Sequence, residues 1–159
     1  MKFDSQICTT KIQSERLSAL GLKKETADCQ HLAYTKDSRG KPIPKRNQKW
    51  FTRIGTEESV QVCGLMNATS IPAWSLHRLI EMIPDKIAYP TIYDSAPLRI
   101  SKNSMCYLHR FFDKYGDEDF STVGDNEAMG SHNVYDYAVS VIGFLIKEGY
   151  FNKEYLEEL

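Results

Sequence analysis

Residues 134–147 read VYDYAVSVIGFLIK, and this stretch decides the fold because it predicts a long helix that is apolar on most of its surface. Asn133 is suited to cap that helix, and Asp136 lies near its positive end. The polar side chains, including Ser140 and Lys147, are confined to one narrow stripe. A helix of this kind has to be covered by other parts of the chain. We therefore expect it to lie across a β-sheet.

A second amphipathic helix is predicted over residues 75–83, SLHRLIEMI. Its leucines and isoleucines recur at i, i+3, i+4 and i+7, which places them on one face of a helix. Pro84 is expected to end the helix because a proline cannot continue it without losing a hydrogen bond.

Trp74 directly precedes this second helix and has two interpretations. If Ser75 is the N-cap, Trp74 and Leu79 form a hydrophobic staple that fixes how the chain enters the helix. If the helix begins a turn earlier, Trp74 projects together with His77 and Arg78 and forms a partner-binding surface. The staple is favoured because it follows from local geometry alone, and the exposed surface stays open as the alternative.

Alternating apolar and polar residues predict β-strands in the rest of the chain. The predicted strands are residues 31–35, 49–54, 87–94, 98–101, 105–112 and 120–123. Residues 60–66 suit either a strand or a helix, and residues 67–70 suggest a loop. An opening helix is expected after Thr10 or Ser14, with Gly21 as its stop. Its apolar stripe would consist of Ile12, Leu17 and Leu20.

These elements predict a single α+β domain over residues 1–159, with a small antiparallel β-meander sheet packed by helices on one face. Residues 1–9 are expected to form a flexible tail, and residues 36–49 a basic loop.

The composition is that of an ordinary globular protein, with 159 residues, 26% charged residues and a formal net charge of −1. This balance argues against a surface devoted to nucleic acid or an anionic membrane, but it allows a local basic patch. We recognise no signal peptide and no membrane-spanning run, which predicts a cytoplasmic protein without a membrane partner. Reduced thiols are then expected, with one oxidised pair as the alternative. The cysteines are Cys8, Cys29, Cys63 and Cys106.

The strongest local charge lies between Lys36 and Arg53, where seven lysines and arginines accompany one acid, Asp37. Trp50 and Phe51 lie within the same segment. Cations contact phosphates and aromatic rings stack on unpaired bases, so these residue types suit single-stranded nucleic acid. The candidate nucleic-acid-binding residues are Lys45, Arg46, Lys49, Trp50 and Arg53. A solvated loop beside a strand with inward aromatic side chains is the simpler and favoured interpretation.

The sequence contains cysteines, histidines and acidic residues of the kinds used in catalysis and metal binding, but their spacing does not match the site motifs considered below. Two short pairs, Cys29 with His31 and Cys106 with His109, fall short of the four convergent ligands of a zinc site. The acidic stretch at residues 113–127 does not have the spacing of a calcium-binding loop. Nucleophile-elbow, P-loop and zinc-protease motifs are not found in the sequence. We therefore expect no cofactor, metal or catalytic residue, and an enzyme is disfavoured rather than excluded.

Three stretches resemble a family of small uncharacterised proteins from gut-bacterial genomes and their phages or mobile elements. They are SERLSALGLKKETADC, IPAWSLHRLIEMIP and FLIKEGYFNKE. Residues 42–49 and 128–133 depart from the family's pattern. The resemblance implies an accessory protein of a mobile element or phage.

Together with the concentration of positive charge between Lys36 and Arg53, this resemblance predicts a non-enzymatic interaction protein that binds an unidentified protein partner. Nucleic-acid binding through residues 36–53 is the alternative. The oligomeric state is left open.

Overall fold

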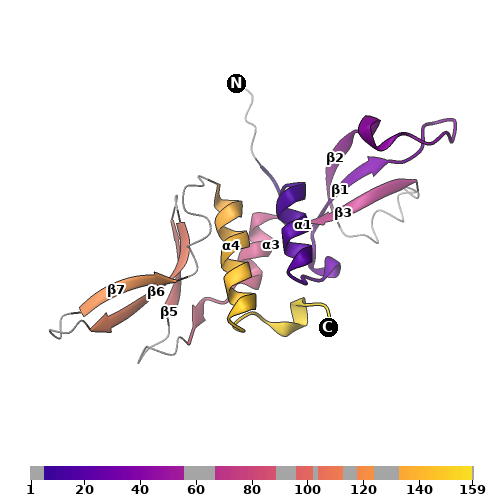
Figure 1. Ribbon diagram of the computed structural model, residues 1–159. Helices are drawn as coiled ribbons and strands as arrows, with labels where there is room; N and C mark the ends of the chain where they lie inside the picture. The colour runs from indigo at the N-terminus through magenta and orange to yellow at the C-terminus, as the bar shows by residue number, and fades with distance from the viewer. Residues whose placement is uncertain are drawn as a thin grey trace, which may run out of the picture. The chain divides into compact units, whose positions relative to one another are not determined.

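The computed structural model describes residues 6–55, 67–88, 96–101, 104–112, 118–123 and 133–158. It has the predicted α+β class, with the strands distributed over two antiparallel sheets instead of one (Figure 1). The chain divides into two compact units, and the boundary between them falls inside a helix after Arg78. The first unit comprises Met1–Arg78 and Tyr155–Leu159, and the second comprises Leu79–Glu154. A single-domain organisation stays a prediction.

The sheet of the first unit has the strand order β2-β1-β3, so β1 lies in the middle (Figure 1). Its strands are β1 (Cys29–Tyr34), β2 (Trp50–Ile54) and β3 (Ala68–Ala73). β1 and β2 confirm two of the strands predicted from alternation. The loop predicted at residues 67–70 is wrong, because three of those residues extend β3 and pair with β1. Pairing with the central strand outweighs the turn preference of Thr69 and Ser70.

Helix α1 (Lys11–Ala19) begins and ends as the sequence predicts. The Thr10 hydroxyl accepts from the amide of Gln13, and the Gln13 side chain accepts from the Thr10 amide, which forms a capping box. Gly21 adopts φ 87° and ends the helix. The predicted apolar stripe is wrong at Ile12, which is 80% exposed, whereas Leu17 is fully buried.

The prediction of a flexible tail over residues 1–9 is wrong for its last two residues. Cys8 and Thr9 are buried, and the Thr9 amide donates to the carbonyl of Trp74 over 2.8 Å. These two residues are therefore part of the first unit, and residues 1–5 lie outside the described part of the chain.

Helix α3 (Leu76–Met82) starts at the predicted N-cap. The Ser75 hydroxyl accepts from the amide of Arg78 at 3.2 Å, which confirms the capping position. Asp28 then fixes the cap from a neighbouring loop, because one carboxylate oxygen accepts from the Ser75 amide at 2.7 Å and the other accepts from the Ser75 hydroxyl. The sequence pattern gave no indication of this role for Asp28.

The sheet of the second unit is a meander with the strand order β4-β5-β6-β7. Its strands are β4 (Lys86–Ile87), β5 (Ala96–Ser101), β6 (Ser104–Phe112) and β7 (Glu118–Val123). The last three correspond to predicted strands. Residues 89–94 of the strand predicted at 87–94, and the element at residues 60–66, lie outside the described residues.

Helix α4 (Val134–Lys147) has the predicted bounds, and its Asn133 side chain accepts from the amide of Tyr135. It contacts β6 of this sheet, and most of its side chains are buried, as expected for a helix that is apolar on most of its surface. Leu79, Ile142 and Leu145 are fully buried, so α3 and α4 both contribute to the core as expected.

Three short 3₁₀ helices complete the described elements. They are η1 (Lys24–Thr26), η2 (Lys45–Asn47) and η3 (Lys153–Tyr155). After η3 the chain is again part of the first unit, in which the Glu157 amide donates to the carbonyl of Gly21 over 2.8 Å.

Candidate functional site

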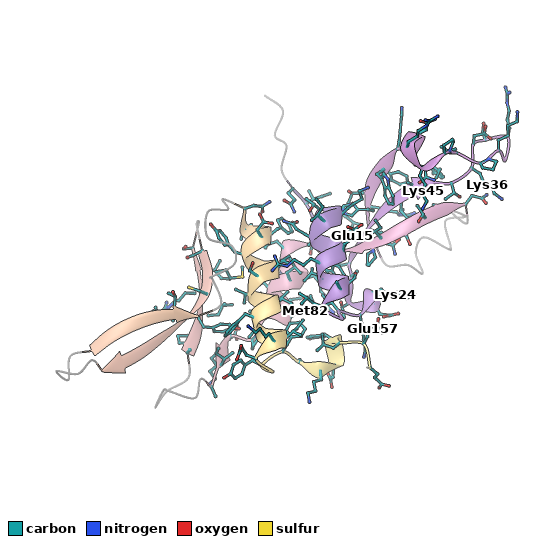
Figure 2. All side chains as sticks on the ribbon, in the orientation of Figure 1. Glu15, Lys24, Lys36, Lys45, Met82 and Glu157 are labelled. Atoms are coloured by element: carbon teal, nitrogen blue, oxygen red, sulfur yellow. The ribbon has the colours of Figure 1, made fainter. Side chains whose placement is uncertain are left out.

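Residues 36–53, which we call the basic arm, connect β1 to β2 and include most of β2. The arm carries a single acidic residue, Asp37, and Figure 2 shows Lys36 and Lys45 projecting from it. Six of its seven cations are exposed, and Arg53 is half-buried. The cations are Lys36, Arg39, Lys41, Lys45, Arg46, Lys49 and Arg53. The basic segment is therefore a solvent-facing surface with an excess of six positive charges.

The end of the arm is a tight turn held by the side chain of Asp37. Oδ1 of this residue accepts from the amides of Arg39 and Lys41, each at 2.9 Å. Gly40 takes φ 74°, a left-handed conformation that a residue with a β-carbon avoids. The turn is thus ordered by local hydrogen bonds, as expected for an aspartate that satisfies nearby backbone amides.

An exposed pair of aromatic rings lies at the base of the arm. The rings of Tyr34 on β1 and Phe51 on β2 have their centroids 5.6 Å apart and are tilted by 34°. Tyr34 is 46% exposed and Phe51 is 38% exposed. Cross-strand neighbours of this kind support each other while leaving ring surface open to a ligand.

The five predicted nucleic-acid-binding residues are distributed unevenly over the arm. Lys45 and Arg46 lie on η2 and are exposed, as is Lys49. Trp50 is half-buried, and the Lys11 ammonium lies 3.9 Å from the centroid of one of its rings. The open aromatic surface is therefore provided by Phe51 and Tyr34 rather than by Trp50. Sequence reasoning missed Tyr34, although an aromatic residue in the strand predicted at residues 31–35, directly before the basic segment, was the available signal.

The alternative partner-binding set, Trp74, His77 and Arg78, is not brought together on the surface. Trp74 is fully buried, whereas His77 is exposed. Arg78 donates through Nε to the carbonyl of Thr26 at 2.9 Å, and its guanidinium lies 5.8 Å from the centre of the Tyr155 ring. Trp74 and Arg78 thus make contacts inside the first unit.

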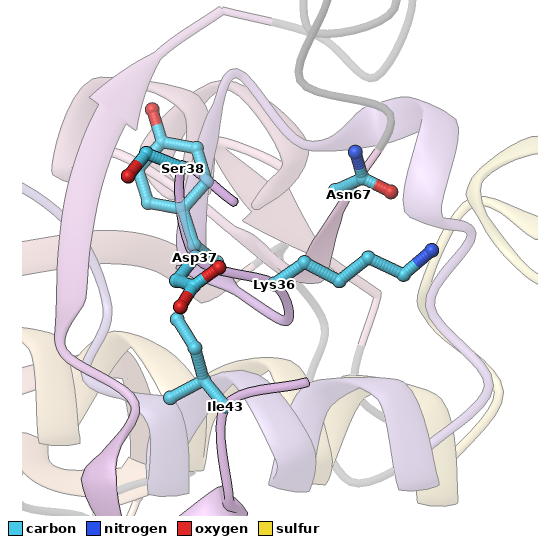
Figure 3. Close-up of a pocket in the computed structure, with 6 residues that line it drawn as sticks. Lys36, Asp37, Ser38, Ile43 and Asn67 are labelled. Atoms are coloured by element: carbon cyan, nitrogen blue, oxygen red, sulfur yellow. The ribbon is translucent and has the colours of Figure 1, made fainter. Parts of the chain in front are cut away.

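An open hollow of about 440 Å³ lies beside the turn of the arm, and we call it the arm pocket. In Figure 3 the Lys36 side chain extends away from that of Asp37, toward the side where Asn67 lies. Aromatic, aliphatic, charged and polar groups all contribute to its wall. The described residues that line it are Tyr34, Lys36, Asp37, Ser38, Ile43 and Asn67.

The backbone around the arm pocket is fixed by short hydrogen bonds. Both the amide and the hydroxyl of Thr35 donate to the carbonyl of Asn67, at 2.7 and 2.6 Å. The Ile43 amide donates to the carbonyl of Thr35 at 2.8 Å. These bonds join three separate stretches of chain, so the wall of the hollow is formed before any ligand arrives.

The cysteine and histidine of β1 are engaged in packing. Cys29 lies in a buried cluster with Cys8 and Ala73. Burial, followed by the nearby Asp28 carboxylate, raises the pKa of the Cys29 thiol to about 12, and burial also raises the pKa of the Cys8 thiol. Thiols of this kind are poor nucleophiles at neutral pH.

His31 makes hydrogen bonds through both ring nitrogens, with Nε2 2.7 Å from the carbonyl oxygen of Thr9 and Nδ1 3.1 Å from the Thr52 hydroxyl. Among the described residues, we find no cluster of three or more histidine, cysteine, aspartate and glutamate side chains suited to holding a metal ion. Cys8, Cys29 and Cys106 are not joined in disulfides, as predicted for these three, and Cys63 lies outside the described residues. No helix in the described part of the chain has the length and apolar character needed to cross a lipid bilayer.

Comparison of the chain with protein-family models, curated proteins and solved structures finds no match. The basic arm and its pocket are therefore the features from which a function can be inferred.

Proposed function

We propose that the chain is a non-enzymatic interaction protein that binds single-stranded nucleic acid through the basic arm. The observation that carries this proposal is the combination of six exposed cations with an exposed aromatic pair on one hairpin. A phosphate backbone releases counterions when it meets such a cluster of cations, and unpaired bases can stack on the rings. The rest of the chain carries a net charge of −7, which favours contact through the arm alone.

The proposal includes a biological setting, an accessory role in a phage or mobile element. The support for that setting is the resemblance of the three sequence stretches quoted above. An accessory protein of this kind can act by coating or marking nucleic acid and needs no catalytic centre.

A protein with an acidic surface is the competing partner, because the same cations would attract carboxylates. The aromatic pair favours nucleic acid, since unpaired bases offer flat surfaces to each of the two rings. The half-buried Trp50 then serves as structural support for the arm, and the exposed cations contact phosphates.

Fluorescence anisotropy with labelled oligonucleotides over a range of salt concentrations tests the proposal. The arm variant is Lys41→Gln/Lys45→Gln/Arg46→Gln, and the matched control is Lys86→Gln/Lys147→Gln/Lys153→Gln, which removes three exposed cations outside the arm. Each phosphate contact that is lost should make the negative slope of log K against log salt shallower by about 0.7 for a single strand.

We expect the arm variant to lose at least about tenfold in affinity and the control variant to bind like wild type. Equal losses in both variants would show that binding follows net charge, not the arm. Retention of an acidic protein together with no oligonucleotide binding at low salt would assign the arm to a protein partner.

A further inference from the structure

We propose that the arm pocket accepts one unpaired base, and that it prefers bases that carry an exocyclic amino group, namely cytosine, adenine and guanine, over thymine and uracil. This inference rests on the proposed function, because it assumes that nucleic acid is the ligand of the arm.

The size and lining of the pocket suit a base. Its volume of about 440 Å³ lies within the range of small-molecule sites. Tyr34 and Ile43 provide aromatic and aliphatic surface on its wall, and Tyr34 is supported by its contact with Phe51. A flat base that enters the hollow can therefore contact apolar surface and an aromatic ring at once.

The charged groups of the wall determine which part of a nucleotide can face them. Asp37 uses Oδ1 for the two amides of the turn, and no hydrogen bond of its Oδ2 is found within the described part of the chain. An ionised carboxylate only accepts hydrogen bonds and repels phosphate. A base amino group is the nucleotide's natural partner for Oδ2, and Lys36 is available for the phosphate.

The geometry of the pocket is maintained without the ligand. The bonds from Thr35 to Asn67 and from Ile43 to Thr35 fix the backbone of two lining residues, Ile43 and Asn67. The Asp37 carboxylate is fixed in the same way by the turn. The pocket then needs little further ordering when a base binds. Its hydrogen-bonding groups keep fixed positions, and fixed positions favour discrimination between bases.

The test compares three single strands of about 12 nucleotides, a length within the usual range of single-strand binding sites: oligo-dC, oligo-dT and an oligonucleotide whose central positions are abasic. Binding is measured by anisotropy for wild type, Tyr34→Leu and Asp37→Asn. Ile54→Ser is the control, since Ile54 is 74% exposed and lies on the opposite face of β2 from Phe51. Circular dichroism confirms that each variant is folded.

Wild type should bind oligo-dC roughly tenfold more tightly than the abasic strand, and more tightly than oligo-dT. Tyr34→Leu should remove most of the difference between base-bearing and abasic strands while leaving the salt dependence unchanged. Asp37→Asn keeps an oxygen for the turn but turns the other acceptor into a donor, so the preference should move from oligo-dC toward oligo-dT.

The outcomes separate this inference from the function on which it rests. Equal affinity for all three strands with a steep salt dependence would overturn the base pocket and leave the arm as a phosphate-binding surface. A base preference that Asp37→Asn does not alter would overturn the role of the carboxylate and hence the amino-group selectivity. No binding to any strand at low salt would overturn the proposed function and the pocket together.

Discussion

The indole Nε1 of Trp74 donates a hydrogen bond to the hydroxyl oxygen of Thr26 over 2.9 Å, in a region where both side chains are buried. Its backbone is also engaged, because the Trp74 amide donates to the Thr9 hydroxyl at 3.0 Å and its carbonyl accepts from the Thr9 amide. Trp74 therefore joins the segment before α1, the 3₁₀ helix η1 and the end of β3. A residue that ties three segments together has a structural role.

Trp74→Phe should lower the free energy of unfolding by about 2–4 kcal/mol, because it leaves a cavity and removes the donor to Thr26. The matched control is Trp50→Phe, which keeps an aromatic ring beneath the Lys11 ammonium at a half-buried position and should cost less than about 1 kcal/mol. Urea denaturation of both variants measures the difference. Similar losses in the two variants would contradict the role assigned to Trp74.

Gly21→Ala should destabilise the chain by about 1 kcal/mol, since φ is 87° at this residue. A β-carbon at this position would have no other atom within 4 Å, so the cost comes from the backbone and not from a clash. Ser18→Ala, at an exposed position in the last turn of the same helix, is the control and should change stability little. Thermal denaturation of the two variants distinguishes them, and an unchanged melting temperature for Gly21→Ala would contradict the left-handed stop.

Stability should fall at alkaline pH because of Cys29. Its thiol has a pKa of about 12 in the folded chain, against an ordinary value of 9.0 for a cysteine thiol. Below pH 9 the thiol is protonated in both states and its contribution is fully present. Above that value the unfolded chain releases the proton while the folded chain retains it, so stability is lost as the pH rises toward the folded pKa.

At pH 10 the loss from this one group should reach about 1.4 kcal/mol relative to pH 7. Urea denaturation of wild type and Cys29→Ala at both pH values isolates the contribution, because the variant has no thiol at this position. Parallel pH dependences in wild type and variant would contradict the raised pKa.

His31 should occupy a single tautomer. Its Nε2 faces the Thr9 carbonyl, which can only accept, so Nε2 carries the proton and Nδ1 of the neutral ring accepts from the Thr52 hydroxyl. Nitrogen-15 NMR of the neutral imidazole should therefore show the Nε2–H form. Observation of the Nδ1–H form would require one of these two hydrogen bonds to be absent in solution.

The helices were predictable from the sequence because their signals are local. The periodic apolar residues of α4, the cap at Asn133 and the capping box at Thr10 each depend on residues within one or two turns. The division into two sheets was not predictable. It depends on which strands pair across long sequence separations, such as β1 with β3, and periodicity carries no information on pairing partners.

The candidate site was predictable only in part for the same reason. The excess of cations between residues 36 and 53 is visible in the sequence, and so is the turn chemistry of Asp37 and Gly40. Whether Trp50 or Phe51 is the exposed ring depends on which face of the sheet α1 covers, and the sequence pattern does not show this. The arm pocket depends on Asn67, a residue that reaches the arm only through the pairing of β3 with β1.

The basic arm should contribute to binding and little to stability. Lys41, Lys45 and Arg46 are exposed, and substitutions at such positions change the free energy of unfolding by about 0.5 kcal/mol or less. Neutralising all three also reduces repulsion among the remaining cations of the arm, so any change should be a gain that disappears at high salt. Urea denaturation of Lys41→Gln/Lys45→Gln/Arg46→Gln at low and high salt measures this effect. A loss of several kcal/mol would mean that these cations hold the fold, and the reduced oligonucleotide affinity of the variant would then report unfolding instead of lost phosphate contacts.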